Sequence, residues 1–232
     1  MHFHNPHRSS GAAHRPAATL PTQGRMIRWA ALYDPFVTLF MLGQRPRLRR
    51  RTVALAALRP GEQVLEVGCG TGDVALAAQA QLGPTGAVTG IDPAPEMIAV
   101  ARAKAARAGV AVAFQLGRIE ALDFAPGSFD VVLSSLMMHH LPGDLKRQGL
   151  AEIARVLKPG GRLLIVDFKR PTSGLERALT RLGGHGSLQL GVQDLTALLS
   201  ATGFTHIEVG PTSFPLLGFV RGERAAAVAT HQ

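Results

Sequence analysis

Short apolar runs alternate with longer helix-favouring stretches along the middle of the chain. The apolar runs predict five strands, and helical stretches separate most of them. Strands that alternate with helices of this size form βαβ units, in which neighbouring strands are parallel. The predicted strands are 63–67, 87–91, 110–116, 129–134 and 162–167, and the predicted helices between them are 72–82, 94–108 and 145–157.

The last part of the chain follows a different order, with two helices followed by two strands. Helices are predicted over 175–182 and 192–202, and strands over 206–209 and 215–220. Because so few residues separate these two strands, we expect an antiparallel hairpin at the sheet edge. The predicted fold is therefore α/β, a Rossmann-like, doubly wound and mostly parallel sheet with an antiparallel edge hairpin and helices on both faces.

The N-terminal region differs from this core. Residues 1–25 have no apolar periodicity, so we expect a disordered tail, and its histidines are better explained as solvated groups than as a metal site. A single domain is predicted over 26–232. Its parts are an N-terminal helical lid (26–60), a cofactor-binding core (61–170), and substrate-side helices and edge strands (171–232).

A glycine-rich turn follows the first predicted strand. Gly68, Gly70 and Gly72 stand at alternate positions, where they permit a tight turn and let a ligand approach the backbone. Asp92 ends the second predicted strand, at the place of a carboxylate that binds ribose hydroxyls. Glycines that only form a turn, with Asp92 capping the next helix, would leave the ordered combination unexplained.

The charge beside this turn favours one cofactor over another. Glu66 precedes the glycines, and its carboxylate would repel the pyrophosphate of a dinucleotide. S-adenosylmethionine carries an ammonium group and a sulfonium but no phosphate. The sequence therefore favours S-adenosylmethionine over NAD, and an NAD-dependent oxidoreductase is the competing enzyme class.

Four segments resemble the motifs of class I S-adenosylmethionine-dependent methyltransferases, in order and in spacing. Within that superfamily the chain resembles the small-molecule branch that includes the ubiquinone/menaquinone-biosynthesis C-methyltransferases, through Tyr33-Asp34, the arginine-rich helix and residues 167–171. The resemblance implies methyl transfer to a small or lipid-like acceptor, of the quinone-precursor or phospholipid type. The four segments are 65–72, 90–97, 129–135 and 155–164.

The resemblance also implies roles for individual residues. Glu66 orders the glycine loop and holds the amino group, Asp92 binds the ribose, and Ser134 lies beside the cofactor. Arg118 stands where relatives often have an aspartate that accepts from the adenine amino group, and arginine cannot accept. The full set of expected cofactor-binding residues is Glu66, Gly68, Cys69, Gly70, Gly72, Asp92, Pro93, Met97, Arg118, Ile119 and Ser134.

Three residues are candidates for the chemistry. His139 and His140 follow the fourth predicted strand, near the methyl side of the cofactor, and histidine suits a general base. Both could instead be structural and orient the loop before Pro142. Tyr33 could close over the cofactor, or it could belong to the core.

The net charge of +9 raises the question of anionic partners. Five arginines between positions 45 and 51 either form the solvated face of a lid helix or touch an anionic membrane. Nucleic acid is disfavoured, because no recognition module and no Asn-Pro-Pro-Tyr-like motif is present. A single cysteine, no long apolar run and no signal-like start predict a cytoplasmic protein without a metal site. A binding protein without catalysis remains a further alternative.

Overall fold

The computed structural model describes residues 22, 34, 43–170, 174 and 191–226. Apart from Thr22 and Asp34, the predicted tail and the predicted helices within 26–42 lie outside the described residues, and so do Tyr33 and the predicted helix over 175–182. The helical elements are α2 (Arg45–Leu55), α3 (Asp73–Leu82), α4 (Pro95–Ala108), η1 (Met138–His140), α5 (Gly143–Val156), η2 (Val192–Asp194) and α7 (Leu195–Ala201).

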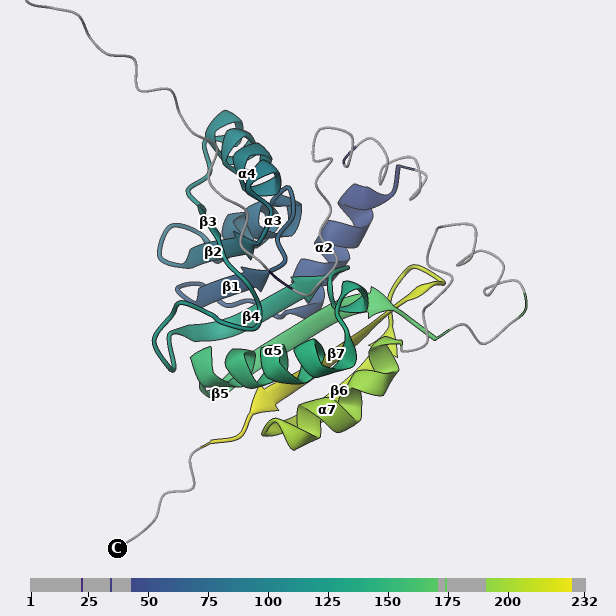
Figure 1. Cartoon of the computed structure of the whole chain (residues 1–232). Helices are drawn as coiled ribbons and strands as arrows, with labels where there is room; N and C mark the ends of the chain where they lie inside the picture. Colours follow the sequence, from purple (N-terminus) through teal and green to yellow (C-terminus); the bar gives the residue numbers. More distant parts are fainter. Residues whose placement is uncertain (1–21, 23–33, 35–42, 171–173, 175–190, 227–232) are drawn as a thin grey trace, which may run out of the picture.

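A seven-stranded sheet in the order β3-β2-β1-β4-β5-β7-β6 forms the centre of the molecule (Figure 1). The first five strands along the chain pair in parallel, and β7 pairs antiparallel with both β5 and β6. This topology confirms the predicted fold class. The strands are β1 (Gln63–Val67), β2 (Ala87–Asp92), β3 (Ala113–Leu116), β4 (Phe129–Ser135), β5 (Leu157–Phe168), β6 (Phe204–Pro211) and β7 (Leu217–Arg224).

Helices cover both faces of the sheet, as Figure 1 shows. Side chains alternate between the faces along each strand, so Val64 and Leu65 belong to different hydrophobic clusters. Val64 shares its cluster with residues of α2, α3 and α4, whereas Leu65 shares its cluster with residues of α5 and α7. The near-continuous burial of β1 reflects this two-sided covering.

Two of the five parallel strands begin at other residues than predicted, and both hairpin strands have other limits than the predicted 206–209 and 215–220. The strand predicted from residue 110 begins at Ala113, because Gly109 is left-handed and the Val110 N–H donates to the carbonyl of Ala105, which closes the end of α4. The strand predicted from residue 162 already begins at Leu157, which pairs with Phe129 before an irregularity in the register.

Candidate active site

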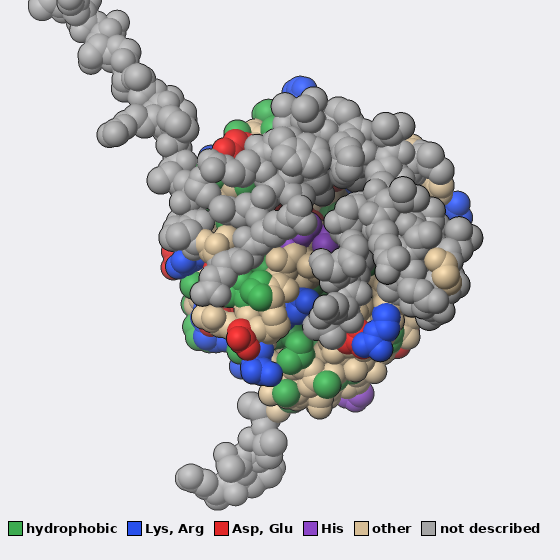
Figure 2. All heavy atoms as spheres, turned by 45° about the vertical axis from the view of Figure 1, so that its right-hand side comes forward, with side chains coloured by type: hydrophobic (Ala, Val, Ile, Leu, Met, Phe, Trp, Pro, Cys, Tyr) green, Lys and Arg blue, Asp and Glu red, His purple; other side chains and the backbone are tan. Residues whose placement is uncertain are grey.

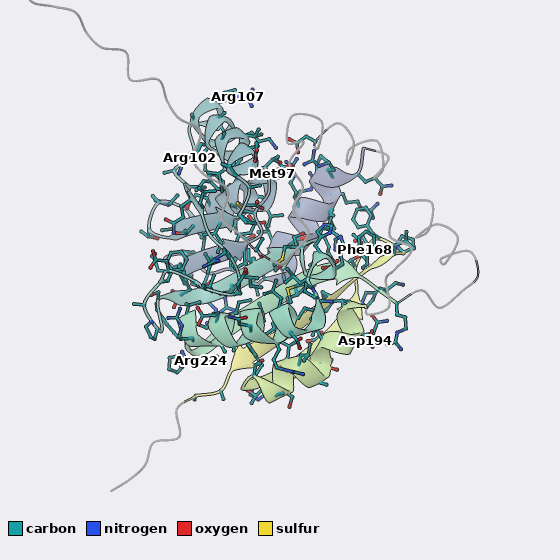
Figure 3. The ribbon with its side chains drawn as sticks, in the orientation of Figure 1. Met97, Arg102, Arg107, Phe168, Asp194 and Arg224 are labelled. Atoms are coloured by element: carbon teal, nitrogen blue, oxygen red, sulfur yellow. The ribbon has the colours of Figure 1, made fainter. Side chains whose placement is uncertain are left out.

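A pocket opens at the carboxyl ends of β1, β2 and β4, where the strand order reverses. Ligands of open α/β sheets bind at such a switch point. These strand ends point to the right in Figure 1, and Figure 3 labels Met97 at the start of α4 and Phe168 at the end of β5 on that side. The glycine loop, the end of β2, residues 117–120, residues 135–141 and α2 all contribute to the lining.

The glycine loop is held in a conformation that favours glycine. Gly68, Gly70 and Gly72 have φ angles of +73°, +51° and +82°, and the N–H groups of Gly68 and Cys69 donate to the carbonyl of Ile91 at 2.9 Å. A Cβ atom on Gly68 would lie 2.3 Å from Met137 Cγ, so glycine is required there for space as well. The loop is therefore tied to β2 and to the loop after β4.

Gly72 lies in a tightly packed place at the end of the glycine loop. It does not belong to the pocket lining, which includes Gly68, Cys69 and Gly70. A Cβ on Gly72 would lie 2.6 Å from Phe114 Cζ and 2.9 Å from Ala101 Cβ. Gly72 thus permits close packing of α3 against the neighbouring helix and strand, rather than ligand approach.

Asp92 lies at the end of β2 and lines the pocket together with Pro93 and Met97. Its Oδ2 accepts from the Gly70 N–H at 3.0 Å and its Oδ1 from the Ala94 N–H at 2.9 Å. Burial raises the pKa of this carboxyl, although both backbone N–H groups lower it. Each oxygen retains acceptor capacity for a ligand hydroxyl, so the loop contact and the turn contact are compatible with ribose binding.

Glu66 is the most unusual polar residue of the pocket. Its side chain is buried, and Oε2 has no hydrogen-bond partner among the residues that the structure describes. Burial raises the pKa of Glu66 well above its ordinary value, and the charges of Asp73 and Asp92 act in the same direction. A backbone hydrogen bond from Ala75 to the carboxyl lowers the pKa in part, so the unpartnered atom is Oε2. A buried carboxyl oxygen without a partner at a pocket wall is a place for a cation. The ammonium of S-adenosylmethionine fits this place, whereas a phosphate would not.

Residues 117–120 form the wall expected to face the adenine. Ile119 is buried against Gly149 and lines the pocket beside Arg118. Arg118 is partly buried and pairs by a backbone bridge with Ala121. The departure noted in the sequence therefore lies in the pocket itself.

The two histidines of η1 face different cavities. His140 lines the main pocket with Leu136, Met137 and Leu141. His139 instead lines a small neighbouring cavity, and its ring is 7% exposed. Of the two candidates for the chemistry, His140 therefore lies at the main pocket, and a catalytic role for either histidine stays a prediction.

Asp167 holds His139 in place. His139 Nδ1 lies 2.7 Å from Asp167 Oδ1, and the His139 N–H donates to Asp167 Oδ2 at 3.1 Å. Asp167 Oδ1 also accepts from the Phe168 N–H at 2.7 Å. The His139 ring meets the Phe168 ring edge-on at 4.9 Å and the His140 ring at 3.9 Å. Asp167 thus fixes both the ring and the backbone of the residue beside His140.

Ser134 is buried inside β4, and its Oγ has no hydrogen-bond partner among the described residues. Ser135, but not Ser134, belongs to the pocket lining, because adjacent strand residues point to opposite faces. The expected place of Ser134 beside the cofactor stays a prediction.

Sequence motifs did not point to the charged residues on the other side of the glycine loop. Arg45, Arg49, Thr71 and Asp73 line the pocket. The spacing of Arg45 and Arg49 by four residues, on a predicted helix, was the available signal that both share one face.

Among the described residues no cluster of three or more metal-ligating side chains occurs. Buried Cys69 has its pKa raised well above the ordinary value by burial and by the charges of Glu66 and Asp92, so it is not an activated thiol.

The sheet order, the glycine loop and the two carboxylates define an S-adenosylmethionine-dependent methyltransferase of class I. Residues 64–161 match the family model of a methyltransferase domain. The chain belongs to the class I S-adenosylmethionine-dependent methyltransferases, and S-adenosylmethionine is its methyl donor. This membership excludes the NAD-dependent alternative.

The proteins that this chain is similar to include methyltransferases named for different substrates. A demethylmenaquinone methyltransferase of Thermus thermophilus is 34% identical over 199 residues, which cover 76% of this chain and 89% of that protein. An arsenite methyltransferase of Halobacterium salinarum is 38% identical over 163 residues, 68% of this chain but 41% of that protein. A solved phosphoethanolamine N-methyltransferase 2 of Haemonchus contortus with S-adenosyl-L-methionine has a TM-score of 0.65 at 19% identity, and covers 77% of this chain and 52% of that one. The last likeness concerns the fold alone.

Proposed function

We propose that this methyltransferase acts on a small apolar acceptor with a ring hydroxyl, of the quinone-precursor type. One observation carries the proposal: His140 stands at the pocket among Leu136, Met137 and Leu141, so a titratable group meets an apolar wall. Such a wall suits an aromatic ring, and the histidine suits its hydroxyl. The demethylmenaquinone methyltransferase of Thermus supports this class, since the similarity extends over most of that enzyme.

The cofactor side of the pocket receives the following roles. Glu66 pairs with the ammonium group, and Asp92 accepts from the ribose hydroxyls while it holds Gly70. The backbone of residues 68–70 borders the methionine part, and the adenine lies against Pro93, Met97 and Ile119, with Arg118 beside it. These roles rest on the shared pocket, on the unpartnered oxygen of Glu66 and on the left-handed loop.

The chemistry requires little from the protein beyond position and one proton transfer. S-adenosylmethionine supplies an electrophilic methyl group. His140 takes the proton of the acceptor hydroxyl, which leaves an electron-rich ring toward that methyl group. His139 has no contact with the reacting groups in this proposal, because Asp167 holds it in the neighbouring cavity. Alignment of donor and acceptor supplies much of the remaining rate.

Arsenite is disfavoured as the acceptor, although one relative acts on it. Arsenic(III) is a soft centre that binds thiolates, as soft metal ions do. Cys69 is the only cysteine of the chain, and burial raises the pKa of its thiol. No pair of thiolates can form within one chain.

A lipid-like acceptor, including a phospholipid, is the second candidate. The observation that favours it is the exposed face of α2, where Arg47, Arg50 and Arg51 lie at helical spacing. These arginines would give the enzyme a peripheral contact with an anionic membrane. No described helix is long and apolar enough to cross a membrane.

The test is an acceptor comparison with isotope-labelled S-adenosylmethionine. Purified enzyme is given a demethylated naphthoquinol, vesicles of phosphatidylethanolamine, or arsenite, and labelled products are identified by mass spectrometry. We expect label on a ring carbon of the quinol, lost in His140→Ala while S-adenosylhomocysteine still binds. Label on the phospholipid headgroup alone would favour the second candidate. Binding of S-adenosylhomocysteine without product from any acceptor would contradict both.

A further inference from the structure

Helix α2 presents two of its arginines to the cofactor pocket. Arg45 and Arg49 lie one helical turn apart, and both line the pocket with Leu48 between them. Arg47 and Arg50 are exposed on the other side of the helix. The arginine cluster therefore divides into an inward pair and an outward group, although the sequence shows it as one run.

The inward arginines belong to a charge network at the start of α3. Asp73 Oδ2 lies 2.5 Å from Arg45 Nη2, and its Oδ1 lies 2.9 Å from Lys104 Nζ and 3.1 Å from Arg49 Nη1. Asp34 contacts Arg45 at 2.7 Å and Lys104 at 2.5 Å. Three cations thus share two carboxylates, and one positive charge is left over beside the pocket.

The surplus falls on Arg49. Both carboxylates contact Arg45 and Lys104, whereas Arg49 has a single ion pair, at the longest of these distances. Within the described part of the chain its guanidinium makes no further hydrogen bond, and 34% of its side chain is exposed. A guanidinium has five N–H donors in a planar fork that matches a carboxylate. Arg49 therefore has the charge and the donors for an anion.

The shared pocket of Arg49 and Glu66 indicates which anion Arg49 would bind. Glu66, Asp73 and Arg49 all line this pocket, and Arg49 contacts Asp73 at 3.1 Å. The amino-acid end of the cofactor has its ammonium and its carboxylate on one carbon atom. If the ammonium pairs with Glu66, the carboxylate must lie a few ångströms away. Arg49 lines the same pocket and has a single ion pair among the described residues, so it can donate to that carboxylate.

We propose that Arg49 binds the carboxylate of the cofactor's methionine end, with Arg45 and Lys104 holding Asp73 and Asp34 as the frame that positions it. This inference rests on the cofactor-binding roles proposed above. It assigns α2, which lies outside the four motif segments of the superfamily, a direct share in cofactor recognition. The chemical class recognised is an α-amino acid carboxylate.

The test compares two ligands that differ only in this group. Calorimetry measures the affinity of the full-length protein for S-adenosylhomocysteine and for its decarboxylated analogue, in which hydrogen replaces the carboxylate. The variant is Arg49→Gln, and the matched control is Arg50→Gln, the exposed neighbour on the same helix. Thermal unfolding shows that each variant is folded, which is expected because Arg49 makes one contact at the surface.

We expect Arg49→Gln to weaken S-adenosylhomocysteine about tenfold and to leave the decarboxylated analogue within about twofold. Arg50→Gln should change neither. Equal weakening of both ligands by Arg49→Gln would overturn the proposal, because Arg49 would then act through the loop. An unchanged affinity for both would overturn it as well. If the unaltered protein binds neither ligand, the cofactor roles themselves fail, which is a separate and recognisable result.

Discussion

The two sides of the pocket are built in different ways. On the proposed cofactor side, the glycine loop, Glu66, Asp92 and Met97 come from one contiguous stretch that runs from β1 to the first turn of α4. On the acceptor side, His140 owes its position to a neighbour that Asp167 holds from 28 residues further along the chain. The proposed binding site for the cofactor is therefore encoded by a local stretch of sequence, whereas the proposed binding site for the acceptor depends on contacts between distant segments.

The two sides also differ in charge. Three carboxylates, those of Glu66, Asp73 and Asp92, line the pocket around the glycine loop. Arg45 and Arg49 also line the pocket, and both contact Asp73. The acceptor side has apolar residues around one histidine. On the face drawn in Figure 2, the acidic and basic side chains of the described residues are interspersed. The net charge of +9 therefore does not produce a uniform basic patch on that face.

The largest effect is expected from a substitution of His140, which should lower turnover but leave cofactor affinity nearly unchanged. His140→Ala is expected to lower kcat by about 10² to 10⁴ because a general base is lost, and to change S-adenosylhomocysteine affinity less than about twofold. Turnover of the identified acceptor and calorimetry provide the two numbers. A parallel loss of cofactor affinity would show that the two sides are not separable at this residue.

Substitution of Asp167 should lower turnover indirectly, because Asp167 holds the backbone and the ring of His139, the neighbour of His140. Asp167→Ala leaves the N–H groups of His139 and Phe168 unpaired in a buried place, which should cost about 3 kcal/mol of unfolding free energy and lower kcat about tenfold. Urea unfolding and turnover are the measurements. Asp167→Asn keeps one of the two acceptor oxygens, while its NH2 group faces an N–H donor, so it should recover only part of the stability. If Asp167→Ala is as stable as the unaltered protein, these hydrogen bonds do not hold η1.

The affinity for S-adenosylhomocysteine should depend on pH through Glu66, which lies on the proposed cofactor side of the pocket. Burial raises the pKa of Glu66 in the free protein above its ordinary 4.5, and a bound ammonium favours the carboxylate. S-adenosylhomocysteine binding should therefore release up to about one proton and tighten by up to about tenfold per pH unit until the raised pKa is reached. Calorimetry in buffers of different ionisation enthalpy measures this release, and Glu66→Gln should abolish it.

The same shift has a consequence for stability. Because the folded-state pKa of Glu66 lies above the unfolded one, unfolding free energy falls as pH rises from 4.5 through the raised value. Glu66→Gln should remove this part of the pH dependence. Proton release that persists in Glu66→Gln would point to Asp92 instead, whose pKa burial also raises.

The smallest effect is expected outside the pocket. Arg50→Gln should weaken binding to vesicles with anionic lipid about fivefold at low salt, since one arginine near a membrane contributes about 1 kcal/mol. Sedimentation of the protein with vesicles measures it, and S-adenosylhomocysteine binding should stay constant. Unchanged vesicle binding would remove the support for a membrane-borne acceptor.

Sequence patterns predicted the sheet because buried parallel strands read as apolar runs and because the glycine motif occurs once. They failed at Val110 and Leu157, where a helix end and a strand extension depend on hydrogen bonds between segments. Most residues that the ordered motifs predicted for cofactor binding line the pocket, with Gly72 and Ser134 as the exceptions.

The acceptor side was less predictable for a physical reason. Ser134 and Ser135 are neighbours in β4, and only Ser135 belongs to the pocket lining. His139 and His140 are neighbours in one helical turn, and they line different cavities. Neither difference changes the residue pattern. Similarly, the roles of Arg45 and Arg49 depend on where α2 docks, and this docking is absent from the family's motifs.

The most direct measurement is calorimetric titration of the full-length protein and of Asp92→Ala with S-adenosylhomocysteine. Micromolar binding to the unaltered protein should fall about 100-fold in Asp92→Ala, because the variant loses the ribose acceptor and the Gly70 contact together. A folded protein that does not bind the ligand, or an Asp92→Ala variant that binds it as tightly as before, would contradict the assignment of this pocket as the cofactor site.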